Sequence, residues 1–296
     1  MASYFLFFIL LLLFVLSLKR VLNKLVSFSS VPHLVRGLMY PIGFVVLCGL
    51  FSLAENSSPI SSFLILFFYL VITHIVMSFR GMSKMAGLIC PAIAIASLAL
   101  PWVDRTDDFS IFPSLIISNI DVFYPFGILN ALVLFQIQYP LSWLGHTFKL
   151  NFRDMKNVLG GFVCLISILI SIGLLMGFLV WNPSQDNFLG LCWGFFSMYF
   201  FIALPEELLF RGIIQNKFEQ SSFLNKYGSW IITSILFGLW HVPTATPGFS
   251  APNWNYGLLA TISGFVYGLV WMRTRKITAS AFVHAGIIFI WNFYLK

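Results

Sequence analysis

The sequence predicts an all-α fold, a polytopic bundle of about 8–10 transmembrane helices. Composition is the first observation behind this fold class: 59% of the 296 residues are hydrophobic and only 9% are charged, whereas a soluble domain carries about 25% charged residues. The mean hydropathy of the chain is +0.92. The second observation is a series of long apolar runs, which are expected to be helices because a helix satisfies its own backbone hydrogen bonds in lipid.

Ten apolar stretches approach the length of about 20 residues that a spanning helix needs. They are expected at roughly 3–18, 37–54, 61–79, 85–103, 118–144, 158–181, 188–210, 228–242, 256–272 and 279–295. The first is expected to be retained as a helix, because it lacks the basic n-region and the A-x-A-like site of a signal peptide. The stretches divide the chain into N-terminal transmembrane helices, residues 1–157, and a C-terminal core, residues 158–296.

Basic residues gather in alternate loops, which is the third observation. The loops after the first, third, fifth, seventh and ninth stretches contain Lys19, Arg20, Lys24, Arg36, Arg80, Lys84, Lys149, Arg153, Lys156, Arg211, Lys217, Lys226, Arg273, Arg275 and Lys276. Because positively charged loops stay in the cytoplasm, both termini are expected on the other side of the membrane. The positive net charge therefore indicates topology and not a nucleic-acid partner.

A charged group, Glu206-Glu207 followed by Arg211, stands at the end of the seventh apolar stretch. Ionised carboxylates at membrane depth are costly and are usually functional. The two glutamates point about 100° apart on a helix, and a glutamate four residues before an arginine is the favoured order for an ion pair. Glu207–Arg211 is therefore expected to be a structural clamp, which leaves Glu206 to face a cavity as a general base. The alternative is that both glutamates begin a cytoplasmic loop at the interface.

Two histidines in later apolar stretches, His241 and His284, are expected to approach Glu206. Either histidine alone is more typical of an interfacial position or of a hydrogen bond between helices. Together with Glu206 they come from three different helices, which predicts that the three side chains converge on one water molecule. His241 lies about 13 residues, or roughly 20 Å, into its span, whereas Glu206 and His284 are expected near the cytoplasmic ends of theirs. Convergence therefore requires an eighth span that begins later, is tilted or is broken.

The motifs in this part of the chain resemble those of the CPBP intramembrane proteases, a family that includes CAAX prenyl endopeptidases and bacterial relatives. The motifs that carry the resemblance are Glu206-Glu207-x-x-x-Arg211, Phe237-x-x-x-His241 and the late His284. They lie in the order typical of the family and cover about residues 188–296. The resemblance implies an intramembrane endopeptidase with a membrane-associated peptide or protein substrate, lipidated substrates included, in the bacterial inner membrane or alternatively the endoplasmic reticulum.

The resemblance also implies a role for each site residue. Glu206 would activate a water molecule for attack on a peptide carbonyl, and His241 would hold that water or share its proton. His284 and Asn292 would stabilise the oxyanion. The family usually has Asn or Asp four residues after the last histidine, and here that position is Ile288. Asn292 lies one turn further on, about 80° around the helix from His284.

The use of a metal and the reaction itself leave alternatives open. Glu206, His241 and His284 would be the ligands of a catalytic Zn²⁺, but HExxH is absent, so chemistry without a cofactor is favoured. The alternatives to a protease are a non-proteolytic scaffold, an immunity or regulatory protein, or a proton-coupled transporter. Clustering of the polar residues in the C-terminal third disfavours the inverted-repeat transporter.

Overall fold

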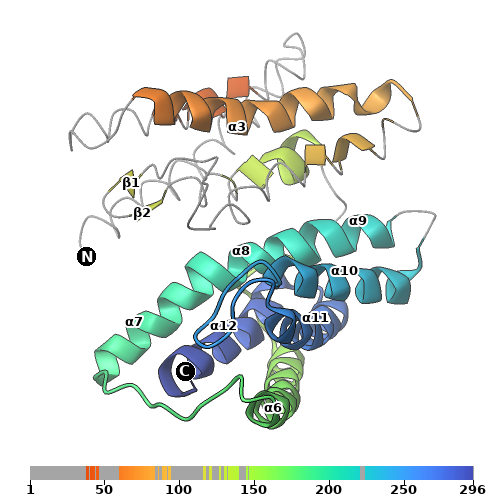
Figure 1. Cartoon of the computed structure of the whole chain (residues 1–296). Helices are drawn as coiled ribbons and strands as arrows, with labels where there is room; N and C mark the ends of the chain where they lie inside the picture. Colours follow the sequence, from red (N-terminus) through yellow and green to blue (C-terminus); the bar gives the residue numbers. More distant parts are fainter. Residues whose placement is uncertain are drawn as a thin grey trace. The chain divides into compact units, whose positions relative to one another are not determined.

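The computed structural model describes residues 60–83, 147–220 and 224–295 without interruption, and Gly145 together with short stretches and single residues between 38 and 139. The chain forms two compact units, Met1–Pro140 and Leu141–Lys296 (Figure 1). The span expected at 3–18 lies outside the described residues. The same holds for most of the spans expected at 37–54, 85–103 and 118–144.

In the described part of the N-terminal unit, a long helix, α3 (Ile60–Ser78), is followed by a short 3₁₀ turn, η1 (Phe79–Gly81). Within α3, the buried His74 hydrogen-bonds through Nε2 to Oδ1 of Asn130 at 2.7 Å, which is the kind of contact between apolar segments that a lone histidine makes. A π-helix, η2 (Val133–Gln138), and an antiparallel pair of two-residue strands, β1 (Ile116–Ile117) and β2 (Ile120–Asp121), complete the elements described here.

The C-terminal unit is helical, and the predicted all-α class is confirmed. Its elements are α6 (Phe152–Leu175), α7 (Phe188–Met198), the π-helix η3 (Tyr199–Ala203), α8 (Leu204–Glu207), the π-helix η4 (Leu208–Gln215), α9 (Asn216–Glu219), α10 (Lys226–His241), α11 (Trp254–Thr274) and α12 (Ile277–Tyr294). Among the described residues, three helices are long and apolar enough to cross a membrane, Phe63–Gly81, Phe152–Leu175 and Ile277–Tyr294. The protein is an integral, multi-pass membrane protein.

Asparagine side chains define where four of these helices begin. Asn151, Asn187, Asn225 and Asn253 each accept a hydrogen bond from a backbone N–H in the first turn of α6, α7, α10 and α11 respectively. Such caps satisfy N–H groups that have no partner within the helix. The cap at Asn151 explains one corrected boundary, since α6 begins at Phe152 and not at 158. The end is also corrected, to Leu175 from 181.

The helix that contains the glutamate pair is longer than predicted. Instead of ending at 210, the helical path that begins at Phe188 continues to Glu219 through α7, η3, α8, η4 and α9 (Figure 1). Pro205 lies inside this path. Proline has no N–H to donate to the preceding turn, and the wider η3 turns lie directly before it. Irregular turns of this kind often occur at functional sites.

This extension removes the difference in depth between Glu206 and His241. Glu206 lies 13 residues before the end of α9 at Glu219, and His241 lies 15 residues after the start of α10 at Lys226. At about 1.5 Å per residue, both are roughly 20 Å from the turn that joins the two helices. The prediction that Glu206 sits at a helix end was therefore wrong, and α10 neither begins late nor breaks.

Helices α10 and α11 approach each other closely through glycines. A β-carbon added at Gly238 would meet the backbone oxygen of Gly257 at 2.5 Å and would also clash with the side chain of Thr261. Gly264 likewise faces the backbone of Ser234. Small residues at such crossings let two helix backbones pack directly against each other.

Replacing Gly238 by alanine is therefore expected to lower the free energy of unfolding by about 1–3 kcal/mol, the usual cost of overpacking. Gly160→Ala on α6 is the matched control, because a β-carbon there meets nothing within 4 Å; this change should leave stability unchanged or raise it slightly. Thermal unfolding of the two purified variants in detergent gives the comparison. Equal unfolding temperatures for both variants would contradict the close α10–α11 contact.

The turn between α11 and α12 is fixed by contacts from two other elements. Arg275 adopts a left-handed backbone conformation with φ of 56°, and its guanidinium forms hydrogen bonds of 2.5 and 2.8 Å to the carboxylate of Glu219 in α9. Lys276 contacts Asp154 of α6 at 2.5 Å, and the backbone oxygen of Gly145 accepts a hydrogen bond from the N–H of Ile277 at 2.9 Å. These contacts join the turn to α9, to α6 and to the segment before α6.

Candidate active site

The three predicted residues Glu206, His241 and His284 lie together. Oε2 of Glu206 is 3.8 Å from Nε2 of His284 and 4.0 Å from Nε2 of His241. Glu206 comes from α8, His241 from α10 and His284 from α12. The convergence of a carboxylate and two imidazoles from three helices, which the sequence predicted, is thus present in the structure.

Glu207 makes a buried ion pair and a second contact that the sequence did not predict. Its Oε1 accepts a hydrogen bond from Nη1 of Arg211 at 3.0 Å, and the side chains of both residues are 0% exposed. The same oxygen accepts from Nδ1 of His284 at 3.1 Å. The spacing of Glu207 and Arg211 predicted the ion pair, but the link to His284 depends on how α12 packs against α8. Glu206 and Glu207 therefore approach the same imidazole from its two nitrogens.

Arg211 is surrounded by groups that suit a buried cation. Its Nη2 donates to the backbone oxygen of Gly264 at 2.9 Å. Its guanidinium carbon lies 4.6 Å from the ring centre of Phe237 and 5.4 Å from that of Tyr267. A carboxylate, a carbonyl and two aromatic faces together compensate for the loss of hydration of the charge. Arg211 thereby connects α10, α11 and η4 behind the site.

The hydrogen bonds of the two histidines determine which ring nitrogen carries the proton. Nδ1 of His241 lies 2.8 Å from the backbone oxygen of Phe237, and Nδ1 of His284 contacts the carboxylate of Glu207. A carbonyl and a carboxylate can only accept, so each Nδ1 must donate. In the neutral imidazoles both Nε2 atoms are therefore acceptors directed toward Glu206.

Aromatic rings hold the two imidazoles in place. Tyr267 stacks on His284 with ring centres 4.5 Å apart and an angle of 20° between the planes. Tyr256 meets His241 edge to face at 4.8 Å. Phe237, which the sequence identified as part of a motif, contacts both histidine rings at 4.7 and 5.5 Å. Tyr256 and Tyr267 were not predicted as site residues. Both lie on α11, and no motif in the sequence around them indicates a catalytic role.

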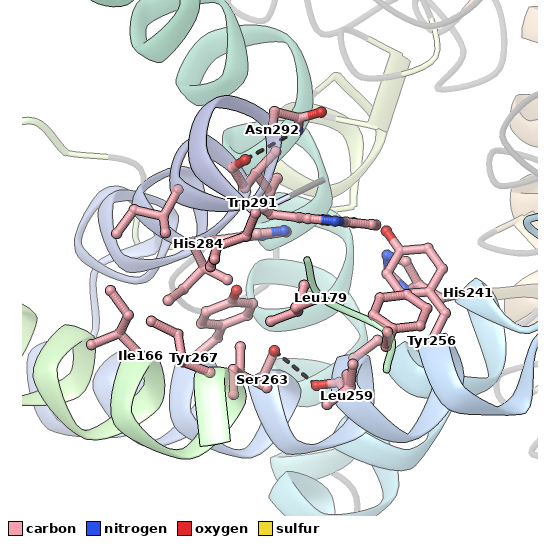
Figure 2. A pocket seen from close by; sticks show the side chains of 18 of the residues that line it. Ile166, Leu179, His241, Tyr256, Leu259, Ser263, Tyr267, His284, Trp291 and Asn292 are labelled. Atoms are coloured by element: carbon pink, nitrogen blue, oxygen red, sulfur yellow. Dashed lines mark hydrogen bonds between the residues drawn. The ribbon is translucent and has the colours of Figure 1, made fainter. Parts of the chain in front are cut away.

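A cavity of about 240 Å³ opens onto this group of residues. Figure 2 shows His241, Tyr256, Tyr267 and His284 around it, with Trp291 from α12. Most of its other lining side chains are aliphatic or aromatic, such as Ile166 of α6, Leu259 of α11, Ile288 of α12 and Leu179 of the segment after α6. The cavity therefore suits an apolar peptide segment whose polar backbone meets a few polar groups.

Asn292 lies at the same cavity but is engaged elsewhere. Its Nδ2 donates to the backbone oxygen of Ile288, one turn earlier in α12, at 3.0 Å (Figure 2). The Ile288 side chain itself lines the cavity at the position where the resemblance implies an amide. Of the six predicted site residues, the structure brings Glu206, Glu207, Arg211, His241 and His284 into one network of contacts and leaves the amide of Asn292 bonded to its own helix.

The predicted zinc ligands do not fit a metal as they are arranged. Ligand atoms that share a tetrahedral Zn²⁺ lie roughly 3.3 Å apart, whereas Glu206 Oε2 is 3.8 and 4.0 Å from the two imidazole nitrogens. Within the part of the chain that the structure describes, no group of three or more histidine, cysteine or acidic side chains is placed to hold a metal ion. A metalloprotease assignment is therefore not supported. The separations instead suit a water molecule hydrogen-bonded to two of these groups at roughly 2.8 Å each.

The fold and the site define a helical, multi-pass membrane protein with a buried glutamate–histidine centre. Residues 188–290 match the family model described as "Type II CAAX prenyl endopeptidase Rce1-like". This match agrees with the resemblance to the CPBP intramembrane proteases that the motifs indicated. The match runs from α7 into α12 and includes all three motifs. Searches of curated proteins and of solved structures found no match to the chain.

Proposed function

We propose that this protein is an intramembrane endopeptidase that hydrolyses a peptide bond with a water molecule activated by Glu206. The observation that carries the proposal is the position of the Glu206 carboxylate, 3.8 and 4.0 Å from two imidazole nitrogens at an apolar cavity. A carboxylate in this position can take a proton from a water molecule held between it and the imidazoles. The Rce1-like family match supports a proteolytic use of this site.

In the proposed reaction, a water molecule occupies the space between Glu206 and the two imidazoles. Its oxygen forms a bond to the carbonyl carbon of the substrate, and its proton passes to the Glu206 carboxylate. The electron pair of the carbonyl bond moves to the carbonyl oxygen. When this tetrahedral intermediate collapses, the carbon–nitrogen bond breaks and the departing nitrogen takes the proton from Glu206.

The histidines position the reactants and share the proton. Three acceptors, Glu206 Oε2 and the two Nε2 atoms, face one another, and one water has only two protons to donate. A water between them can therefore donate to two of the three acceptors at a time. Glu207 accepts the Nδ1 proton of His284 and thereby holds that ring with Nε2 toward the cavity, while Arg211 holds Glu207.

The proposed substrate is a membrane-associated peptide or protein. The aliphatic lining of the cavity favours an extended apolar segment, and the family match makes prenylated C-termini the first substrate class to examine. Entry from the bilayer would bring the scissile bond to the carboxylate without exposing the apolar walls to water.

Cells that carry the wild-type protein are expected to contain cleaved termini of membrane proteins that are absent when Glu206 is replaced by alanine. Terminal-peptide mass spectrometry of the membrane proteome gives this comparison, with the variants matched in abundance. His241→Ala should remove the same termini, since it takes away one of the groups that holds the water. Identical termini in wild-type and Glu206→Ala cells, together with an unchanged phenotype, would contradict proteolysis and favour a non-proteolytic scaffold or regulator.

A further inference from the structure

The predicted site is rich in hydrogen-bond acceptors and poor in donors. Both neutral imidazoles present an acceptor nitrogen to the cavity, because their Nδ1 atoms donate to the Phe237 oxygen and to Glu207. Glu206 is also an acceptor. Hydrolysis creates negative charge on the substrate oxygen, and stabilising it requires donors aimed at that oxygen. The general base and a neutral histidine pair do not supply them.

Other polar side chains around the cavity donate to the protein's own backbone. The amide of Asn292 donates to the Ile288 oxygen at 3.0 Å, and the hydroxyl of Ser263 donates to the Leu259 oxygen at 2.9 Å. Ile288, where the family resemblance implies an amide, is apolar. Tyr256, on another element, offers a donor that is not engaged with the backbone in this way.

Tyr256 of α11 has the position that this donor requires. It lines the cavity together with Glu206, His241 and His284, and its ring lies edge to face against the His241 imidazole. Among the residues that the structure describes, no hydrogen bond to its hydroxyl is formed. The hydroxyl is therefore available to a ligand in the cavity, beside the imidazole of His241 (Figure 2).

The side chain of Tyr256 is also held rigidly, which a preorganised donor needs. Its backbone N–H donates to the capping side chain of Asn253 at 3.0 Å in the first turn of α11. Its ring contacts three other rings: His241 at 4.8 Å, Trp291 at 5.1 Å and Phe178 at 5.9 Å between centres. A donor fixed in this way needs little reorganisation when charge develops, and the loss of one such donor typically lowers kcat by about 10²–10³-fold.

We propose that Tyr256 is a catalytic residue whose phenol O–H donates to the substrate carbonyl oxygen as that oxygen becomes negatively charged. It takes the place of the amide that residue 288 lacks. This inference rests on the proposed proteolytic function. The phenol donates a hydrogen bond and keeps its proton, so the proton balance of the reaction is unchanged.

Tyr256→Phe tests the proposal, because it removes the hydroxyl and keeps the ring contacts. With a substrate identified from the cellular termini, kcat of the purified protein should fall by about 10²-fold or more with little change in KM. An inhibitor that mimics the tetrahedral intermediate, such as a phosphinate peptide, should lose affinity by a similar factor. Tyr227→Phe, at the exposed start of α10, is the matched control and should behave as wild type.

Two further variants separate the proposal from its competitors. Asn292→Ala and Trp291→Phe remove the other donors near the cavity, and each should lower kcat less than Tyr256→Phe does. Wild-type kcat and inhibitor affinity in Tyr256→Phe, or a larger loss in Asn292→Ala or Trp291→Phe, would overturn the assignment of Tyr256 while leaving the proteolytic function intact. A wild-type protein that cleaves nothing would instead overturn the proposed function itself.

Discussion

Replacing Glu206 by glutamine is expected to lower kcat by about 10²–10⁴-fold, the range that a general base usually contributes. The change keeps the size of the side chain but removes the negative charge that would take the proton from water. The glutamine amide has nearly the size of the carboxylate, so it should occupy the same space beside the imidazole nitrogens at 3.8 and 4.0 Å. The measurement is the initial rate of peptide cleavage by purified protein in lipid vesicles.

Glu219→Gln is the matched control for this loss, since it is the same chemical change on the same helical path. Glu219 pairs with Arg275 at the end of α9, away from the cavity lining. Its removal should leave kcat within a few-fold of wild type. If Glu206→Gln retained wild-type kcat, or if Glu219→Gln lost as much activity, Glu206 would not be the base.

Replacing Arg211 by methionine is expected to produce the largest loss of stability, about 3–5 kcal/mol in the free energy of unfolding. Both partners of the Glu207–Arg211 pair are 0% exposed, so the variant leaves a buried carboxylate without its cation. His284 would also lose its fixed orientation, because Glu207 holds its Nδ1 proton. Denaturant unfolding in mixed micelles measures the change.

Arg273→Met provides the control, because Arg273 is exposed near the end of α11; surface changes of this kind usually alter stability by less than about 0.5 kcal/mol. The double variant Glu207→Gln with Arg211→Met should recover part of the lost stability, since no unpaired charge then remains buried. A loss in Arg211→Met no larger than that in Arg273→Met would show that the pair does not stabilise the fold. Equal losses in the single and double variants would show that the residual carboxylate is not the cause.

Several features could be predicted because they depend on neighbouring residues. The apolar stretches at 256–272 and 279–295 correspond to α11 and α12 within a few residues, since hydrophobic length is a local property. The Glu207–Arg211 pair followed from a spacing of four within one helix. In contrast, the end of the apolar run predicts that the seventh helix ends near 210, whereas in the structure the helical path continues to Glu219.

Three features were predictable without the fold: the all-α membrane class, the grouping of Glu206, His241 and His284, and the clamp formed by Glu207 and Arg211. Composition and apolar length indicate the first, charged and polar residues in apolar stretches the second, and a spacing of four within one helix the third. Three others follow from helix packing alone: Glu207 also binds His284, Asn292 is bonded to its own helix, and Tyr256 lies at the cavity. These contacts join side chains from different helices, and their geometry depends on how the helices pack, which no local pattern of residues specifies.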